Sequence, residues 1–479
     1  MSSGETVMPN QARIGECGDE LYDVVVVGAG VTGIGAACVL RERRMRFIIL
    51  EGSDDVGGIW STNRWHGARC DSDFIKYSYS FAPALTAQCH QDAARVHAYL
   101  QDVARQFDLL PCIRFKANVI RAAFDETEVC WVVTTDQGSV KARFLINGNG
   151  YFAEPHLPEL PGIHEFQGQV LHTLNLDDGV EFRTSRVVVV GSGSTAICCA
   201  PALGDVAKTL TLVQRSPSYI FDIENDEIGW VTRLCQDLYS RGVRWPVAML
   251  RYYLQCKDDA IFVLFRRFPR FWRNYFAKIW APCMSTREFQ RNFSPVYSPW
   301  EQRPTFSMGL RQRIADGRVS VHTGEISHFD DTSLTLTDGT RIPCDVCVLA
   351  TGYELNLLKF DLLVADKRVE IGGLSFFKRL MLGGVPNYFQ PFGTVHSAWT
   401  QSLEPGVALA VKIMSYMDKH GYRKVCIDPV DVDWKPGITP NYIMRAISRL
   451  PHSYGTFELP SLDRLFSYHF KPGAYTFEA

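Results

Sequence analysis

Two stretches of the sequence share one pattern, in which a run of valines leads directly into a glycine-rich turn. The first is YDVVVVGAGVTG, which begins at Tyr22, and the second is SRVVVVGSGSTA, which begins at Ser185. Four consecutive valines are typical of a strand buried on both faces of a parallel sheet. A strand, a tight glycine turn and a helix in this order begin a dinucleotide-binding βαβ unit. The chain is therefore predicted to be an α/β protein with two Rossmann-like dinucleotide-binding domains.

The first turn has the spacing GxGxxG, supplied by Gly28, Gly30 and Gly33. The first glycine makes the turn, the second lets backbone N–H groups approach a pyrophosphate, and the third lets the helix pack closely on the strand. The N-terminus of that helix adds unpaired donors and a favourable dipole. The next strand is predicted to end at Glu51, where an acidic residue is expected to meet a ribose hydroxyl. This pattern favours FAD, or in principle NAD, at the first turn.

The second turn repeats the pattern as GxGxxA, with Gly191, Gly193 and Ala196. Its second strand is predicted to end in Gln214 and Arg215 rather than in an acid. A guanidinium binds a 2′-phosphate in a bidentate manner, whereas a carboxylate would repel it. The second turn is therefore interpreted as an NADPH site. The alternative for Arg215 is a solvated arginine at the end of a strand.

Later segments close each of the two units. RFLINGNGYF ends the first unit at Gly150, and CDVCVLATGYE ends the second at Thr351 and Gly352. The polar and aromatic stretch inside the second unit is predicted to form an inserted helical subdomain. The predicted organisation is an FAD-binding domain in two parts, 20–160 and 353–479, an NADPH-binding domain in two parts, 161–221 and 303–352, and the helical insert 222–302.

Composition argues against several other classes of protein. The formal net charge is −2 over 479 residues, so the basic footprint of a nucleic-acid partner is absent. The first twenty residues are polar and acidic, which fits neither a secretory signal nor a transit peptide. The 14 cysteines are scattered, so reduced thiols and a cytoplasmic location are predicted. Cys344 and Cys347 form a CxxC inside an apolar run, which favours core packing over a redox or metal pair.

One stretch suggests a peripheral membrane contact, although no run of about 18 apolar residues exists to span a bilayer. Residues 261–280, IFVLFRRFPRFWRNYFAKIW, are both aromatic and basic. Their basic residues could face anionic lipid while the aromatic rings enter the interface; they are Arg266, Arg267, Arg270, Arg273 and Lys278. The interpretation that we favour is a helical insert whose aromatics pack on the body, with Pro269 interrupting any single helix.

A group of motifs follows the first unit and narrows the class. Gly57, Gly58 and Trp60 form GGxW, and GARCD (67–71) and YSYSF (77–81) come after it. These motifs resemble those of class B flavoprotein monooxygenases, and of the Baeyer–Villiger enzymes in particular. NFSPVYSPWEQRP, FFKRLMLGGVPNYF and HSAWTQS resemble the group that includes the bacterial ethionamide-activating monooxygenase. Disulfide reductases also have two dinucleotide folds in tandem, but they need a cysteine pair here, where only one cysteine stands.

The resemblance implies an NADPH- and O₂-dependent monooxygenase. Such an enzyme inserts one oxygen atom into a lipophilic ketone through a C4a-peroxyflavin, giving an ester or lactone. Arg303 in WEQRP aligns with the family's active-site arginine, which stabilises the peroxide anion, and Asp71 aligns with the carboxylate that orients this arginine. A surface ion pair is the alternative for Arg303, and a helix cap or surface charge for Asp71.

The resemblance also assigns further FAD contacts, namely Gly58, Trp60, Asp71, Tyr77 and Trp399. Trp399, Thr400 and Gln401 fall where the family's C-terminal segment approaches the isoalloxazine. The alternative for these three residues is a helix start that packs on the sheet.

The stretch EFQGQVLHTLNLDD lies between the two glycine turns. Phe166, Gly168 and His172 match the FxGxxxH core that the class places in the linker between its FAD and NADPH domains, where it couples domain movement to catalysis. Leu176 and Asp177 stand where Baeyer–Villiger enzymes usually have Trp-Pro. An N- or S-oxygenating flavin monooxygenase of the same fold is therefore the first alternative. A flavin reductase is the second, but it would need no residue in the role of Arg303. The sequence predicts neither the substrate nor the oligomeric state.

Overall fold

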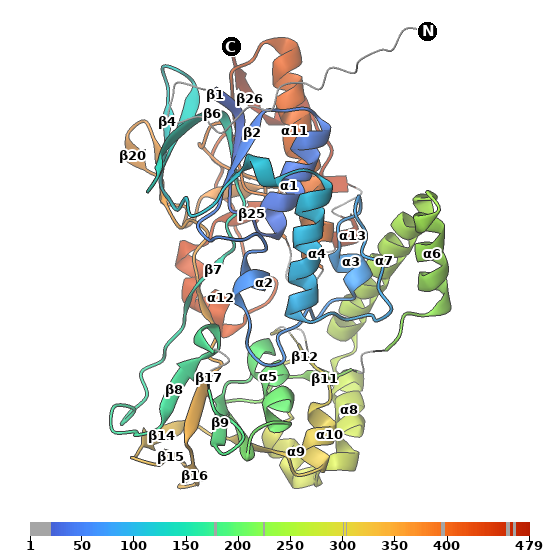
Figure 1. Ribbon diagram of the computed structural model, residues 1–479, viewed down its shortest axis with the longest axis vertical. Coiled ribbons are helices and arrows are strands. Elements are labelled where there is room, and N and C mark those ends of the chain that lie inside the picture. Colours follow the sequence, from blue (N-terminus) through green and yellow to red (C-terminus); the bar gives the residue numbers. More distant parts are fainter. Residues whose placement is uncertain are drawn as a thin grey trace, which may run out of the picture.

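The computed structural model describes residues 21–176, 180–223, 226–299, 301–302, 304–393, 398–456, 460–462 and 466–479. Two sheets lie towards opposite ends of the long axis (Figure 1), one around β1 (Leu21–Val27) and one around β9 (Arg186–Val190). Two helices, α6 (Trp230–Ser240) and α7 (Trp245–Arg267), project to one side. This arrangement confirms the predicted α/β fold with two Rossmann-like sheets.

The first sheet has the strand order β20-β19-β4-β5-β6-β1-β2-β3, and β23 also pairs with β6. Its other strands are β2 (Phe47–Leu50), β3 (Ile113–Arg114), β4 (Val119–Asp125), β5 (Cys130–Thr135), β6 (Gly138–Asn147), β19 (Asp361–Val364), β20 (Lys367–Arg368) and β23 (Tyr388–Phe389). β1 runs parallel to both β2 and β6. Val24 and Val26 pack in a core with residues of α1 (Val31–Glu42) and α11 (Trp399–His420), and the intervening Val25 packs in the core on the other face. The valine run is thus buried on both faces of the sheet.

The second sheet is wholly parallel, with the order β13-β10-β9-β17-β8. Its other strands are β8 (Gln169–His172), β10 (Thr209–Gln214), β13 (Val319–Thr323) and β17 (Val346–Leu349). Val187 and Val189 pack in a core with residues of α5 (Ser194–Gly204), while Val188 faces the opposite core. The second valine run therefore occupies the same kind of position as the first.

Two adjacent strands connect the sheets. The chain leaves the first sheet through β7 (Phe152–Pro155) and returns through β18 (Tyr353–Leu355). These strands pair antiparallel, with Tyr353 opposite Pro155. The outgoing and returning segments thus lie side by side in one ribbon, although about two hundred residues separate them.

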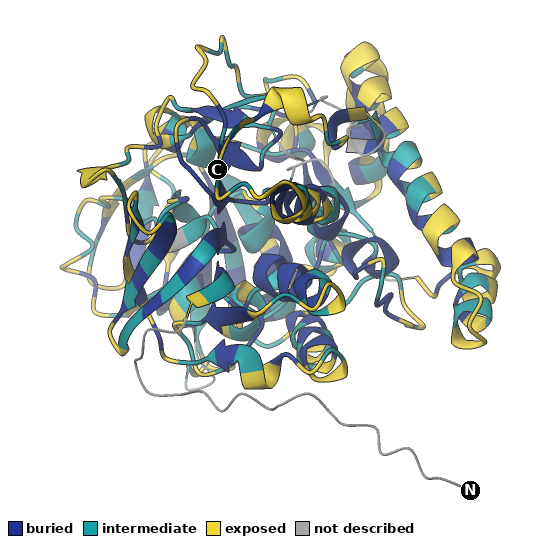
Figure 2. Cartoon of the chain, turned by 90° about the horizontal axis from the view of Figure 1, so that it is seen from above, coloured by how far each residue is buried: buried dark blue, intermediate teal, exposed yellow. Residues whose placement is uncertain are grey.

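The helical insert consists of α6, α7, α8 (Pro269–Trp280) and α9 (Thr286–Asn292). The expected interruption at Pro269 is confirmed, because α7 ends at Arg267 and Pro269 opens α8. The inner side of α7 and α8 packs through buried aromatic residues that include Phe265, Phe276 and Trp280. Seen from above (Figure 2), the projecting helices have long exposed surfaces on their outer sides.

The remaining elements complete the two lobes of the molecule, one built around each sheet. They are α2 (Ile59–Thr62), α3 (Phe74–Tyr77), α4 (Ala93–Gln106), α10 (Leu310–Ala315), α12 (Asn441–Ala446), α13 (Pro460–Leu462), β11 (Ile220–Asp222), β12 (Thr305–Ser307), β14 (Ile326–Phe329), β15 (Ser333–Leu336), β16 (Arg341–Pro343), β21 (Ser375–Phe377), β22 (Met381–Leu382), β24 (Lys424–Cys426), β25 (His452–Tyr454) and β26 (Thr476–Glu478). Across the described ranges, no helix has the length and apolar character needed to cross a bilayer. Cys344 and Cys347 are both buried in a core of the second sheet.

Candidate active site

The first glycine turn joins β1 to α1 and has one open position. Gly28 has a φ of +91°, and its N–H donates to the carbonyl of Leu50 at 2.8 Å. A Cβ on Gly33 would lie 1.8 Å from the carbonyl oxygen of Gly28, so this glycine is required for helix packing. A Cβ on Gly30 would meet nothing nearer than the Cα of Gly58, at 3.7 Å. The space beside Gly30, at the N-terminus of α1, is therefore available to a pyrophosphate.

A fourth glycine supports this turn, and it lies two residues before Gly150, where the first unit was predicted to end. Gly150, predicted to close the first unit, has no neighbour that a Cβ would meet within 4 Å. Gly148 is the residue in contact with the turn: its N–H donates to the carbonyl of Val27 at 2.9 Å, and an added Cβ would lie 3.1 Å from the nitrogen of Gly33. The NGNG sequence pointed to this region but not to the glycine that packs.

Glu51 follows β2 and faces the same turn. One carboxylate oxygen accepts from the N–H of Ala29 at 2.6 Å, and the other accepts from the N–H and the hydroxyl of Ser53, both at 2.8 Å. A carboxylate oxygen has two lone pairs, so the oxygen beside Ala29 can accept a further hydrogen bond. The arrangement therefore places an acceptor where a ribose hydroxyl is expected.

The GGxW motif packs directly against this first turn. Gly58 has a φ of +58°, and a Cβ there would lie 3.1 Å from the Cα of Gly30. The indole N–H of Trp60 donates to the hydroxyl of Tyr77 at 2.7 Å, and the two rings meet edge to face with centroids 5.7 Å apart. Burial raises the pKa of Tyr77 well above its usual value, with the nearby Cys70 and Asp71 adding to the rise. Tyr77 is therefore a neutral hydroxyl group.

Asp71 lies on the loop between this motif and α3, and it is partly exposed. Arg303, its predicted partner, is outside the described residues, so the pairing stays a prediction. The segments that contain them do approach each other. The guanidinium of Arg69 contacts the sulfur of Met308, and a Cβ on Gly67 would lie 2.3 Å from the carbonyl oxygen of Cys198. The GARCD loop thus meets both α5 and the chain that follows Arg303.

The second glycine turn repeats the geometry of the first. Gly191 has a φ of +147°, and a Cβ there would lie 2.4 Å from the carbonyl oxygen of Ala350. Gly193 is the N-cap of α5, and a Cβ on it would meet no atom within 4 Å. Ala196 is fully buried. The closing segment is held by the hydroxyl of Thr351, which donates to the carbonyl of His156 at 2.5 Å.

The two residues at the end of β10 differ in orientation. Gln214 is buried, and its amide nitrogen donates to the carbonyl of Asn292 at 2.6 Å and to the hydroxyl of Thr323 at 3.0 Å. Its side chain thus ties β10 to the neighbouring β13 and α9. Arg215, the next residue, is exposed. Of this pair, Arg215 is the one accessible to a ligand at the second turn.

The start of α11 brings Trp399 to the first turn. Its indole N–H donates to the hydroxyl of Thr32 in α1 at 3.1 Å, and its ring stacks on Tyr151 with centroids 5.3 Å apart. Thr400 and Gln401 are buried and donate to the backbone carbonyls of Lys76 and Arg251, respectively. Packing within the protein therefore explains the burial of Thr400 and Gln401. Trp399 lies beside α1, the helix that begins directly after Gly30.

Comparisons with known proteins identify the family of the chain. The matching family model, flavin-binding monooxygenase-like, covers residues 22–235. The FAD-containing monooxygenase EthA of Mycobacterium tuberculosis is 30% identical over 453 residues, which are 90% of this chain and 91% of EthA. The chain belongs to the flavin-binding monooxygenase-like family. The predicted class, a flavoprotein monooxygenase, is confirmed.

Two solved structures share the fold of this monooxygenase. A structure titled oxidized steroid monooxygenase bound to NADP matches with a TM-score of 0.79 at 23% identity, covering 96% of this chain and 100% of that one. An open structure of cyclohexanone monooxygenase matches with a TM-score of 0.78 at 20% identity and the same coverage. Because 96% of this chain is covered, the helical insert and both sheet regions belong to one shared architecture.

The FxGxxxH stretch of the monooxygenase connects the second sheet to the ribbon between the lobes. Phe166 packs edge to face on Phe329, with centroids 5.5 Å apart, and a Cβ on Gly168 would lie 2.3 Å from the carbonyl oxygen of Asp345. His172 accepts from the N–H of Leu174 at Nδ1, 3.2 Å, while its Nε2 lies 3.1 Å from the carbonyl oxygen of Gly352. A carbonyl can only accept, so His172 is the neutral Nε2–H tautomer. The histidine ties the outgoing segment to the returning one.

His172→Phe should destabilise the protein, and the loss should depend on pH. Burial lowers the pKa of His172. Its stabilising contribution is therefore complete above the unfolded pKa, about 6.5, and is lost as pH falls below that value. Losing both hydrogen bonds should cost about 1–3 kcal/mol at neutral pH. Differential scanning fluorimetry at several pH values should show the Tm gap between wild type and variant narrowing in acid. A constant gap would contradict the neutral-histidine assignment.

One buried side chain had no recognisable sequence pattern. Arg251 of α7 is 1% exposed. Its guanidinium donates to the carbonyls of Ile75 and Ser78, and it lies 3.5 Å from the carboxylate of Glu404. It thus attaches the insert to α3, to Ser78 directly after α3, and to α11. An arginine in an amphipathic helix is usually solvated, so only the tertiary contacts reveal this role.

Proposed function

We propose that this flavoprotein monooxygenase uses FAD and NADPH with O₂ to insert one oxygen atom into a lipophilic ketone, giving an ester or lactone. The observation that supports the two cofactors best is the pair of open glycine positions, Gly30 and Gly193, each at the N-terminus of a helix. The first lies beside the carboxylate of Glu51 and the second on the sheet whose strand β10 precedes the exposed Arg215. The acid suits a ribose, and the guanidinium suits a 2′-phosphate.

We assign FAD to the first turn and NADPH to the second. When bound, reduced FAD supplies the activation of dioxygen. The residues proposed to contact FAD are Gly28, Gly30, Gly33, Glu51, Gly58, Trp60, Asp71, Tyr77 and Trp399, and those proposed for NADPH are Gly191, Gly193, Ala196, Gln214, Arg215, Thr351 and Gly352. For Gln214 the proposed role is through the backbone, since its side chain amide is bonded within the protein. The proposed domain limits are those predicted from the sequence.

Arg303 and Asp71 are the proposed catalytic residues. A cation beside the reacting oxygen disfavours its protonation and so favours attack on a carbonyl carbon. Asp71 would position that cation. The contact between Arg69 and Met308 supports the proximity of the two segments.

The second candidate function is N- or S-oxygenation on the same fold. The departure at Leu176 and Asp177 favours it, because Leu176 is packed in the core of the second sheet where Baeyer–Villiger enzymes usually have tryptophan. Mass spectrometry of products from a panel of ketones and sulfides, with NADPH and O₂, distinguishes the two reactions. Ester or lactone formation supports the first proposal, whereas sulfoxide formation with no ester supports the second.

Arg215→Ala should weaken NADPH selectively. The exposed guanidinium is proposed to bind only the 2′-phosphate, which NADH lacks. Losing a charge-assisted hydrogen bond costs about 1.5–3 kcal/mol, so the KM for NADPH should rise about ten- to a hundredfold. Steady-state kinetics with NADH provides the control and should be unchanged. An equal rise of both KM values would show that Arg215 is not the discriminating residue.

A further inference from the structure

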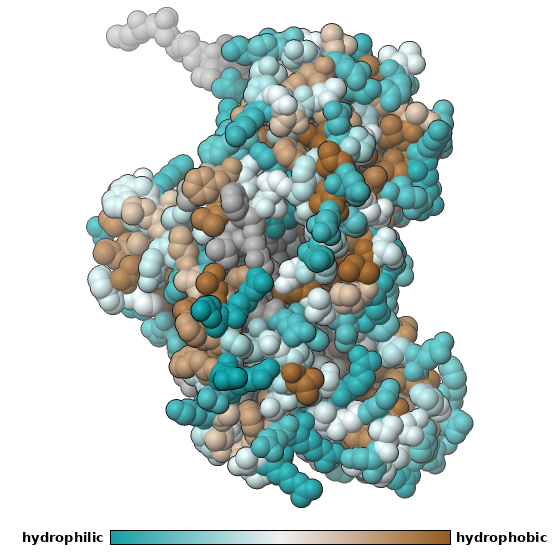
Figure 3. Space-filling model, turned by 180° about the vertical axis from the view of Figure 1, so that it is seen from behind, coloured by the Kyte–Doolittle hydropathy of each residue, from teal (hydrophilic) through white to brown (hydrophobic). Residues whose placement is uncertain are grey.

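Exposed apolar side chains are concentrated on the helical insert. Of the 22 large hydrophobic residues that are exposed in the described part of the chain, 12 lie between Trp230 and Tyr275. They are Trp230, Val231, Leu234, Val243, Trp245, Met249, Tyr253, Val263, Leu264, Phe268, Phe271 and Tyr275. Seen from behind (Figure 3), the projecting helices carry hydrophobic residues interspersed with hydrophilic ones. Scattered exposed hydrophobics are normal, but a gathered set marks an interaction surface.

The helix α7 has an exposed apolar row and a buried polar row, although Val247, Phe262 and Phe265 of the same helix are buried as well. Trp245, Met249 and Tyr253 follow one another at intervals of four, and they are 64%, 63% and 63% exposed. Arg251, Gln255 and Asp259 have the same spacing and are 1%, 3% and 5% exposed. Residues four apart share one face of a helix, so the apolar face points to solvent and a polar face points to the protein.

Polar contacts hold α7 in this orientation. The guanidinium of Arg251 binds the carbonyls of Ile75 and Ser78, and the carboxylate of Asp259 accepts from the N–H of Ser461 at 2.8 Å. Rotation of α7 that buried its apolar face would leave these charged groups without the partners that compensate their burial. The exposed apolar face is therefore a fixed feature of the fold.

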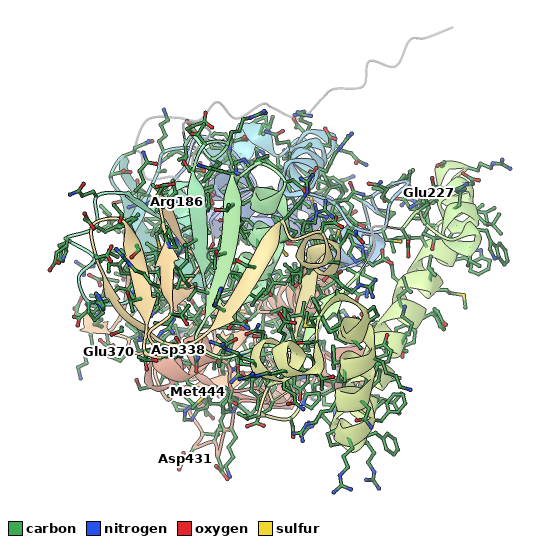
Figure 4. The ribbon with its side chains drawn as sticks, turned by 90° about the horizontal axis from the view of Figure 1, so that it is seen from below. Arg186, Glu227, Asp338, Glu370, Asp431 and Met444 are labelled. Carbon is green, nitrogen blue, oxygen red and sulfur yellow. The ribbon has the colours of Figure 1, made fainter. Side chains whose placement is uncertain are left out.

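The same region is basic in a chain of net charge −2. Residues 226–280 contain ten lysines and arginines against five aspartates and glutamates. Three of these acids are engaged within the protein: Asp258 with Lys76, Asp259 with Ser461, and Glu227 with Arg233. Figure 4 shows Glu227 beside the start of the projecting helices. Apolar and aromatic residues accompanied by basic ones match an anionic lipid surface, whereas a second copy of this face would be repelled.

We propose that the outer faces of α6 and α7, with the α7–α8 corner at Phe268 and Phe271, bind an anionic membrane surface. This lipid-facing surface differs from the stretch 261–280 predicted from the sequence, in which Phe262, Phe265, Phe276 and Trp280 are buried. It also extends further, to Trp230 and Trp245. The proposal is independent of the reaction that the enzyme catalyses.

Vesicle co-sedimentation of the full-length, flavin-loaded protein tests the proposal. The protein should pellet with vesicles of phosphatidylcholine and phosphatidylglycerol, and less with phosphatidylcholine alone or at high salt. W245S/M249S should weaken binding at least about tenfold, because the variant lacks two apolar side chains whose transfer from water into the membrane interface favours binding. Leu157→Ser is the matched control, since Leu157 is equally exposed, at 61%, but lies outside the insert, and it should bind like wild type.

Two results would overturn the proposal. One is wild-type protein that stays in the supernatant with both kinds of vesicle, and the other is W245S/M249S binding as well as wild type. Sedimentation velocity without lipid tests the alternative occupant, which is a second copy of the chain. A dimer that W245S/M249S dissociates would assign this surface to that second copy. Both substituted side chains are solvent-exposed, so the variant should retain wild-type circular dichroism and flavin absorbance.

Discussion

Gly30→Val should yield a folded protein that has lost its yellow colour. The backbone of Gly30 has φ −78° and ψ −170°, which valine adopts readily, and a Cβ there meets no protein atom closer than 3.7 Å. The valine side chain would instead fill the space through which a pyrophosphate reaches the N–H groups of α1. We expect FAD affinity to fall by at least about a hundredfold, as two or more backbone hydrogen bonds to a charged group are lost. Absorbance near the flavin bands, measured after gel filtration and compared with circular dichroism, checks this.

Gly193→Val is the matched control. Gly193 has φ −82° and ψ 176°, and a Cβ on it meets no protein atom within 4 Å. This variant should therefore fold, remain yellow and lose NADPH binding. Gly33→Val would be an unsuitable test, because its Cβ would lie 1.8 Å from the carbonyl oxygen of Gly28 and would disrupt the turn itself. Full FAD occupancy in Gly30→Val would contradict the assignment of the first turn.

Arg303→Ala should separate reduction of the flavin from oxygen transfer. Hydride transfer from NADPH does not need a cation that opposes protonation of the reacting oxygen, whereas attack on a ketone does. We expect anaerobic bleaching by NADPH to persist and ester formation to fall about a hundred- to a thousandfold, a typical effect of removing one electrostatic stabiliser. The NADPH consumed in air should then appear as hydrogen peroxide. Stopped-flow absorbance, with product and peroxide assays, measures both steps.

Asp71→Asn is the companion variant, because it keeps the size of the side chain and removes its charge. It should show the same uncoupling more mildly, through a less well oriented arginine. Wild-type ester yield from Arg303→Ala would exclude this arginine as the catalytic group. It would also favour the N- or S-oxygenating reaction, which does not need an anionic attacking oxygen.

The two dinucleotide folds were predictable because their determinants are local. A buried parallel strand needs consecutive apolar residues, and the turn that follows needs glycines at fixed offsets. Val24 to Val27 and Gly28, Gly30 and Gly33 satisfy both conditions within a dozen residues. The interruption at Pro269 was predictable for the same reason, since the missing N–H acts on its own helix.

The amino-acid sequence alone also located the motifs that pack around the turns, but not the contacts they make. Gly58 lies on Gly30, and Gly148 rather than Gly150 supports the turn, because these contacts depend on where distant loops arrive. Both Gln214, the last residue of β10, and Arg215, the next residue, were predicted to contact NADPH, yet the side-chain amide of Gln214 faces the interior and Arg215 is exposed. Which of two neighbours in a strand is buried follows from the side of the sheet that is covered.

The helix α7 shows most clearly what could not be predicted from the sequence. Its sequence mixes apolar and charged residues around the whole helix, and an ordinary assignment would bury Trp245 and Met249 and expose Arg251. The structure does the opposite, because the carbonyls of Ile75 and Ser78 lie where they can accept from the guanidinium, and a buried charge is stable only with such partners. The strands and glycine turns were thus determined by the local sequence itself. The direction in which the apolar face of α7 points was decided by partners about 170 residues away in the chain, and only the tertiary structure brings those partners to α7.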